Sequence, residues 1–180
     1  LLIPSVFDMN TFSFRTALMR NDGLNGTGGF NFTEVDSVFE PTKHASSMWA
    51  DFDNDTDLDL LLVNMVPNSD EGFIKRYRND GNGNFVSENI LDSLTVEHGE
   101  AQWGDFDNDG DMDIYLANSN APNQLFKNNG NGTFSDVSAS YGVDDPTQSF
   151  SCGWFDYEND ADLDLYVANA STGIDKLYRN

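Results

Sequence analysis

Residues 103–113 read Trp-Gly-Asp-Phe-Asp-Asn-Asp-Gly-Asp-Met-Asp, and this stretch decides how the chain is organised. A carboxylate stands at every second position of a nine-residue loop that runs from Asp105 to Asp113. Like charges this close disfavour each other's ionised form, so the loop needs a cation to hold its carboxylates together. Hard oxygen ligands in this number suit Ca²⁺. The stretch therefore predicts a calcium site.

The same loop occurs three times along the chain. The other copies begin at Trp49 and Trp154, and each is followed by an apolar run such as Leu60–Val63. The tryptophans recur about every 50 residues, and self-similarity at such a period is the signature of a repeat architecture. The sequence thus predicts up to three Ca²⁺ sites. Their candidate ligands are Asp51, Asp53, Asp55, Asp57, Asp59, Asp105, Asp107, Asp109, Asp111, Asp113, Asp156, Glu158, Asp160, Asp162 and Asp164.

Each loop fits a cation site built in a β-hairpin. We expect the side chains at its first, third and fifth positions to converge as the chain turns, and the ninth position to return a carboxylate from the following strand. The seventh position offers its backbone carbonyl, so the side chains of Asp57, Asp111 and Asp162 are expected to point away from the ion. Gly110, at the sixth position of the second loop, supplies the sharp turn that this ligand spacing demands.

The three copies of the loop are not equal. Thr56 and Ala161 stand where the second loop has Gly110, and neither residue favours a positive φ. Glu158, at the third position of the last loop, is longer than the aspartates at the same position elsewhere. We therefore expect the second site to be the best formed and the third to be the weakest.

Other structures contain similar acidic stretches. An EF-hand needs flanking helices and a glutamate at position 12, where these loops have Leu62, Leu116 and Val167. Glycine-rich calcium rolls repeat roughly every nine residues, and this chain does not. A solvated turn without a metal is the alternative for any one loop, but three copies at a fixed distance from tryptophan favour the metal site.

A second repeated phrase follows the acidic loops. It is a glycine-rich turn that ends at Phe85 in one repeat and at Phe134 in the next, and its residues accept the positive φ of tight hairpins. With the acidic hairpin it divides each repeat into four short antiparallel strands, which is the pattern of a β-propeller blade. We therefore predict an all-β fold with two strands before the first loop.

The predicted architecture is a β-propeller fragment of about three blades. Its repeat units are expected at about 1–40, 41–95, 96–145 and 146–180, the first and last of them partial. The chain begins without methionine and stops inside a repeat phrase, so we expect it to be part of a longer protein.

Composition excludes several classes of function. The net charge of −22 argues against nucleic acid and anionic membranes as partners. No apolar stretch approaches the roughly 18 residues of a membrane span, so we expect no membrane insertion in this segment. The single cysteine, Cys152, takes the place of Ser47 and Ala101 in the other repeats, which predicts a small packed residue rather than a reactive thiol.

The loop, the tryptophan before it and the glycine turn after it together resemble the FG-GAP or VCBS-type repeat of integrin α-chain-like propellers. The chain looks closest to the form found in ASPIC/UnbV-like bacterial proteins, over nearly its whole length. The resemblance implies a propeller with Ca²⁺ in the hairpins between the first two strands of its blades. It also implies an extracellular, periplasmic or cell-surface setting, a role in adhesion or ligand binding, and a protein or carbohydrate ligand.

The sequence offers little support for catalysis. It contains no nucleophile elbow, phosphate-binding loop or zinc motif, and we predict neither catalytic residues nor an organic cofactor. His44 and His98 hold the same position before their loops, which favours a structural role repeated in each blade over a catalytic pair. A calcium-stabilised binding module is thus the leading hypothesis. The alternatives are a propeller domain of a secreted carbohydrate-active enzyme, such as a polysaccharide lyase, and a purely structural spacer.

Overall fold

The computed structural model describes residues 2–8, 13–35, 39–41, 46–65, 72–91, 100–170 and 173–180. His44 and His98 lie outside these residues. The chain is an all-β propeller fragment, as predicted, and its described part forms four antiparallel sheets with one short helix, α1 (Ser138–Tyr141).

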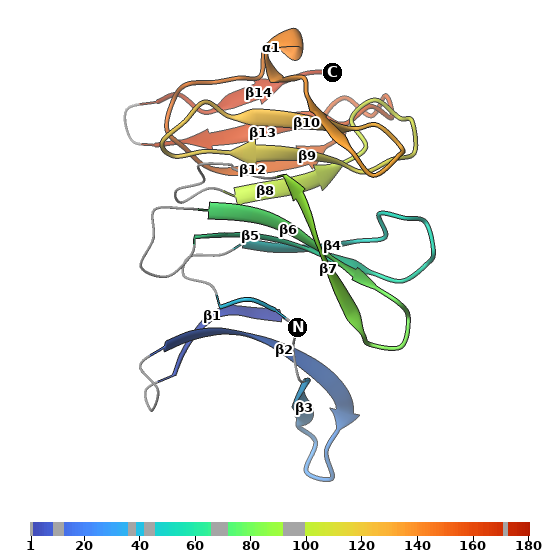
Figure 1. Cartoon of the computed structure of the whole chain (residues 1–180). Helices are drawn as coiled ribbons and strands as arrows, with labels where there is room; N and C mark the ends of the chain where they lie inside the picture. Colours follow the sequence, from blue (N-terminus) through green and yellow to red (C-terminus); the bar gives the residue numbers. More distant parts are fainter. Residues whose placement is uncertain are drawn as a thin grey trace.

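The four sheets are stacked in chain order, from blue to red in Figure 1. The first contains β1 (Leu2–Asp8), β2 (Ser13–Leu24) and β3 (Phe30–Val35). The second contains β4 (Ser46–Ala50), β5 (Asp59–Met65), β6 (Gly72–Asn79) and β7 (Phe85–Leu91). The third contains β8 (Glu100–Gly104), β9 (Asp113–Ala117), β10 (Gln124–Asn128) and β11 (Phe134–Asp136). The fourth contains β12 (Ser149–Phe155), β13 (Asp164–Asn169) and β14 (Lys176–Tyr178).

Successive sheets meet through their first strands. Strand β8 contacts β4 on one side and β12 on the other, and β1 contacts β4. Within each sheet the strands follow one another in chain order. This is the arrangement of propeller blades, in which the first strand of each blade is the innermost. The acidic loops join the first and second strands of the last three sheets.

The first sheet differs from the prediction, because it has three strands before the first acidic loop instead of two. The extra strand is β1, which pairs with β2. Its sequence carries no acidic loop to mark it, and Pro4 has no N–H to donate to a ladder. The pairing accordingly shifts register between Ile3 and Val6. A strand of this kind gives no repeat signal in the sequence.

The second strand of each complete sheet is buried on both faces, as its apolar run predicted. Leu60–Val63 are at most 2% exposed, and Ile114–Ala117 are fully buried. Side chains alternate along a strand, so neighbouring residues of β5 pack against different sheets. Leu60 and Leu62 share a cluster with Phe39 on the side of the first sheet. Leu61 and Val63 belong to the cluster that joins the second sheet to the third.

The third apolar cluster joins the third sheet to the fourth, and it contains Cys152. Cys152 is 6% exposed, which confirms the prediction that it is a packed residue. Burial, with a smaller contribution from Glu100, raises the pKa of Cys152 to about 12. The thiol is therefore a packing group rather than a nucleophile.

The glycine-rich turns form the predicted hairpins. Gly81 and Gly83 have φ values of +77° and +82°, and Gly130 and Gly132 have +70° and +84°. In the described part of the chain, no helix is long and apolar enough to cross a membrane.

Candidate metal centres

The first aspartate of each acidic loop fixes the turn of the backbone. The two carboxylate oxygens of Asp105 accept hydrogen bonds from the N–H groups of Asp109 and Gly110, both at 3.0 Å. The other loops make the same pair of bonds at the same distances. Asp51 accepts from the N–H groups of Asp55 and Thr56. Asp156 accepts from those of Asp160 and Ala161. The three loops therefore share one backbone conformation, whatever their sixth residue.

The sixth position of every loop has a positive φ, as the turn was predicted to require. Gly110 has φ +90°, and Thr56 and Ala161 adopt +80° and +75° in its place. A side chain in this region costs on the order of 1–3 kcal/mol and persists only where its surroundings enforce it. The first and third loops therefore carry a backbone strain that the second avoids.

The ninth aspartate anchors the loop to the sheet. Asp113 is fully buried and accepts hydrogen bonds from the N–H groups of Phe106 (3.1 Å) and Asn128 (2.7 Å). Burial outweighs these bonds and raises the pKa of Asp113 to about 6. Asp59 takes the same place in the first loop and accepts hydrogen bonds from the N–H groups of Phe52 and Asn79. Asp164 takes it in the third loop and accepts them from Tyr157 and Asn180.

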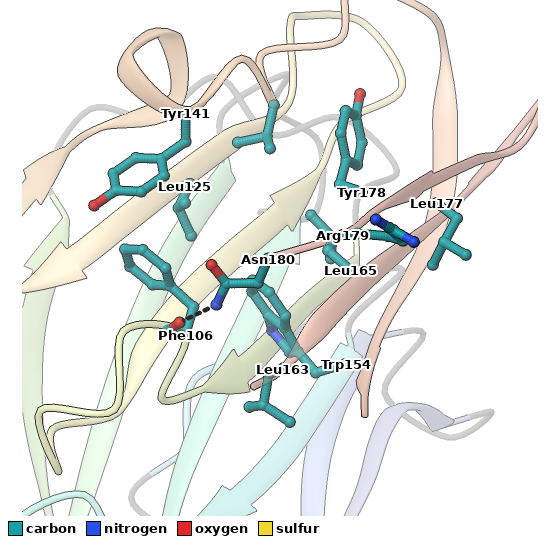
Figure 2. A pocket seen from close by; sticks show the side chains of 11 residues that line it. Phe106, Leu125, Tyr141, Trp154, Leu163, Leu165, Leu177, Tyr178, Arg179 and Asn180 are labelled. Carbon is teal, nitrogen blue, oxygen red and sulfur yellow. Dashed lines mark hydrogen bonds between the residues drawn. The ribbon is translucent and has the colours of Figure 1, made fainter. Parts of the chain in front are cut away.

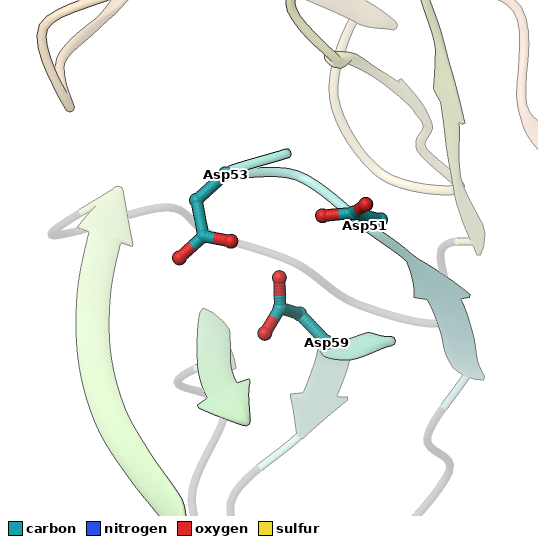
Figure 3. A group of neighbouring side chains, drawn as sticks. All are labelled: Asp51, Asp53 and Asp59. Atoms are coloured by element: carbon teal, nitrogen blue, oxygen red, sulfur yellow. The ribbon is translucent and has the colours of Figure 1, made fainter. Parts of the chain in front are cut away.

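Two loops bring three carboxylates together. Asp51, Asp53 and Asp59 each place one oxygen within 4.8 Å of the others, and Figure 3 shows the three side chains facing a common space. Asp105, Asp107 and Asp109 form the corresponding group in the second loop. The third loop forms no such group, although its residues all lie in the described part of the chain. The first group thus uses positions 1, 3 and 9, and the second uses positions 1, 3 and 5.

The donor set of these groups fits a hard divalent cation. Two oxygens bound to one Ca²⁺ at 2.3–2.6 Å can lie at most about 5 Å apart, and the separations within each group meet that limit. Crowding also has an electrostatic effect on the first group. Burial and the charges of Asp55 and Asp51 raise the pKa of Asp53. A cation held by Asp51, Asp53 and Asp59, or by Asp105, Asp107 and Asp109, would relieve this repulsion.

The seventh aspartates lie outside the carboxylate groups. The Asp57 carboxylate lies against Gly81, where an added Cβ would stand 2.3 Å from Oδ2, and Asp111 lies in the same way against Gly130. Asp162 instead accepts a hydrogen bond of 2.7 Å from Nδ2 of Asn108, which joins the third loop to the second. The glycine turns are therefore needed for space as well as for φ.

The remaining predicted residues have other surroundings. Asp55 and Asp160 each accept a hydrogen bond from the N–H of the aspartate two residues later, as Asp109 also does for Asp111. Glu158 lies 3.4 Å from the guanidinium of Arg179.

The sequence did not lead us to predict that basic residues lie beside the acidic loops. Lys127 forms ion pairs with Asp107 and, at 2.8 Å, with Asp109. Arg179 holds the equivalent place beside the third loop, where it pairs with Glu158. Arg78 lies near the first loop, and its charge lowers the pKa of Asp53, although burial and the neighbouring aspartates have the larger, opposite effect. The signal was present in the sequence, because a basic residue precedes an asparagine at or just after the end of the third strand in each of the last three sheets. These cations partly neutralise the loops from within the same sheet.

Part of the chain is similar in sequence to cartilage acidic protein 1 of three species. Over 67 residues it is 45% identical to mouse cartilage acidic protein 1 and 43% identical to the human protein, and each match covers 37% of this chain and 10% of the relative. The Xenopus tropicalis protein of the same name is 37% identical over 87 residues, which are 48% of this chain and 13% of that protein. The chain thus matches only a small part of these relatives' length.

The comparison with protein families concerns the loops directly. The model of the FG-GAP-like repeat matches residues 51–116 and again residues 105–167. Both matches begin at the first aspartate of an acidic loop, and together they span more than half of the chain. The protein therefore belongs to the FG-GAP-like repeat family.

Proposed function

We propose that this chain is a calcium-binding extracellular β-propeller module that serves adhesion or ligand binding. The observation that carries the proposal is the convergence of Asp51, Asp53 and Asp59 on one space at the end of a blade hairpin. The second loop also gathers three carboxylates, although at positions 1, 3 and 5. The oxygen-only donor set and the hairpin geometry both suit Ca²⁺. All fifteen loop acids named above contribute to the three sites, as direct ligands or through negative potential.

The proposed ions have a structural role. Each acidic loop joins the first two strands of a sheet, and its ninth aspartate is buried against the third strand. A bound ion would offset the repulsion between carboxylates and fix the hairpin in the conformation that the sheet needs. Affinities on the order of 10⁻⁴–10⁻³ M would suffice, because extracellular modules work at high calcium concentration.

The family and the negative net charge support the proposed cellular location and ligand. FG-GAP-like repeats support an extracellular, cell-surface or periplasmic location and a protein or carbohydrate ligand. The relatives are named for cartilage and for acidity, and this chain shares the acidity with a net charge of −22. We propose no catalytic role for the chain, since its clustered carboxylates are assigned to cations.

A calcium titration by isothermal calorimetry tests the metal sites. We expect the protein to bind Ca²⁺ and to gain thermal stability with it, and Asp51→Asn and Asp105→Asn each to lose one site. Asp144→Asn is the matched control, because it removes the same charge from an exposed position outside the loops. Unchanged binding in the Asp51→Asn, Asp105→Asn double variant would overturn the assignment.

A second experiment tests the role in adhesion. Binding to immobilised extracellular matrix proteins and glycans is measured with Ca²⁺ and with a chelator. Calcium-dependent retention supports the proposal. Cleavage of a polysaccharide to unsaturated products would instead favour the lyase alternative.

A further inference from the structure

A polar pocket of about 220 Å³ lies between the second sheet and the third, next to the first acidic loop. Asp53 and Asn54 line it from the first loop, and Arg76 lines it from β6. Asp111 lines it from the second loop, beside the glycine turn that follows β10. Both sheets have four strands, so the pocket is enclosed by two complete sheets.

Arg76 stands at a position where the next two sheets have leucine. Strand pairing places it level with Leu125 in the third sheet and with Leu177 in the fourth. Leu125 lines the pocket between those two sheets together with Phe106, and Figure 2 shows both side chains on its wall. Arg76 therefore turns an apolar corner of the junction between sheets into a polar one.

The guanidinium of Arg76 is buried, and only part of it is paired. Arg76 is 8% exposed, and its guanidinium carbon lies 3.5 Å from the centroid of the Phe52 ring. Nε donates to Oε2 of Glu88 at 3.0 Å, and Nη2 donates to the same oxygen. Nη1 makes no hydrogen bond with any residue that the structure describes. Burying a charged group with an unpaired donor is costly, so the arrangement favours a ligand that accepts from Nη1.

Two further side chains at the pocket lack partners. Within the described residues, neither the amide of Asn54 nor the carboxylate of Asp111 takes part in a hydrogen bond. Their counterparts meet directly at the next junction, where Nδ2 of Asn108 donates to Asp162 at 2.7 Å. The pocket thus separates two groups that can pair, and a ligand between them can bond to both.

The groups around the pocket define the chemistry of the ligand. A guanidinium only donates hydrogen bonds and a carboxylate only accepts them, so the ligand must offer acceptors to Arg76 and donors to Asp111. A hydroxyl group supplies both. The carboxylates of Asp53 and Asp111 disfavour an anion, and the guanidinium disfavours a cation. The volume is below the roughly 300 Å³ of pockets that enclose drug-sized ligands, which suits a single sugar residue.

We propose that this pocket binds one neutral sugar residue, whose hydroxyl groups bridge Arg76 and Asn54 to Asp111. The inference rests on the ligand-binding role proposed above and narrows the ligand to a carbohydrate. Asp53 also belongs to the carboxylate group of the first loop, so a cation there and the sugar would share one wall of the pocket.

The test is an NMR titration of the isotope-labelled protein with the methyl glycosides of glucose, galactose, mannose and N-acetylglucosamine. We expect at least one of them to bind with a Kd on the order of 1–10 mM, the range for so small a ligand. Its binding should shift the side-chain amide of Asn54 and the backbone amides of Gly130 and Gly132, which also line the pocket. Glucuronate and glucosamine, the charged counterparts, should bind more weakly. The titrations are run with Ca²⁺ and with a chelator, and binding in either condition counts.

Two variants on different walls test the assignment. Arg76→Leu introduces the residue that the next two sheets have at this position, and it should weaken binding roughly tenfold through loss of a charge-assisted hydrogen bond. Asn54→Gly removes the amide and keeps the φ of +58°, and it should weaken binding roughly threefold. Asn108→Gly is the matched control, because it makes the same change in the second loop, away from the pocket.

Unchanged sugar binding in both Arg76→Leu and Asn54→Gly would overturn the pocket. Absence of binding by all the neutral glycosides would overturn it as well, and so would tighter binding of glucuronate or glucosamine. Retention on matrix proteins without any sugar binding would contradict this pocket and still support the binding module proposed above. Loss of every kind of ligand binding would overturn both, so the two failures are distinguishable.

Discussion

The indole of Trp154 lies directly over the backbone of Gly104, so that a Cβ on Gly104 would stand 2.7 Å from Cδ1 of the ring. The two residues belong to the first strands of neighbouring sheets, β8 and β12. No side chain larger than hydrogen fits between them without a shift of the ring or of the strand. The spacing of these sheets is therefore set by a glycine against a tryptophan.

Gly104→Ala should destabilise the protein by about 1–3 kcal/mol, the usual cost of overpacking a close contact. Gly153→Ala is the control, since a Cβ there would meet nothing within 4 Å and the residue also lies in a first strand. Urea unfolding of both variants checks the prediction. A loss of stability as large in Gly153→Ala would show that strand conformation, rather than contact with Trp154, is responsible.

Replacement of Lys127 by methionine should tighten Ca²⁺ binding to the second loop by roughly two- to fivefold, the worth of an exposed ion pair. A cation bound by Asp107 and Asp109 must displace the ammonium group that pairs with them. Calorimetric titration measures the change. Lys75→Met is the control, because Lys75 pairs with Glu40 away from the loops. Weaker binding in Lys127→Met would mean that the lysine supports the site.

Glycine at the sixth loop position should stabilise the loops that lack it. Thr56→Gly and Ala161→Gly remove a side chain from a positive φ, and each should gain on the order of 0.5–1 kcal/mol after the entropy cost of glycine. Gly110→Ala should lose stability by a similar amount. Chemical denaturation in the presence of a chelator separates this backbone effect from metal binding. The idea fails if all three changes have the same sign.

Acid should destabilise the protein partly through Asp145, which is 3% exposed. Burial acts to raise the pKa of Asp145, but bonds from Lys176 (2.9 Å), Thr147 and Asn169 prevail and lower it to about 2. The unfolded value is about 3.9, so this contribution is complete above that pH and is lost as pH falls toward 2. It amounts to roughly 2 kcal/mol.

Asp145→Asn checks the pH dependence. The difference in unfolding free energy between wild type and Asp145→Asn should shrink as pH falls from about 5 to about 2. Asp144→Asn, an exposed neighbour, should show no such change. A constant difference across this range would remove Asp145 from the pH response.

The features that the sequence predicted are local. The acidic hairpins, the positive φ of Gly110 and the double burial of Leu60–Val63 each follow from a few adjacent residues. The first strand was missed because its pairing with β2 leaves no periodic pattern. The bond from Asn108 to Asp162 was also missed, since it depends on how two sheets pack. The spacing of aspartates along a loop likewise does not determine which of their carboxylate oxygens come together. The first loop groups its positions 1, 3 and 9, whereas the second groups its positions 1, 3 and 5.

The alternation along β5 has a consequence for assembly. Leu60 and Leu62 face the preceding sheet while Leu61 and Val63 face the following one, so the two faces of a sheet are not interchangeable. Sheets therefore join head to tail in one direction, and each added unit repeats the same contact. A single-residue deletion in β5 would exchange its two faces and disrupt both junctions at once. A sheet added to the row must therefore present both faces in the same order, and the angle between neighbouring sheets determines how many of them close a ring.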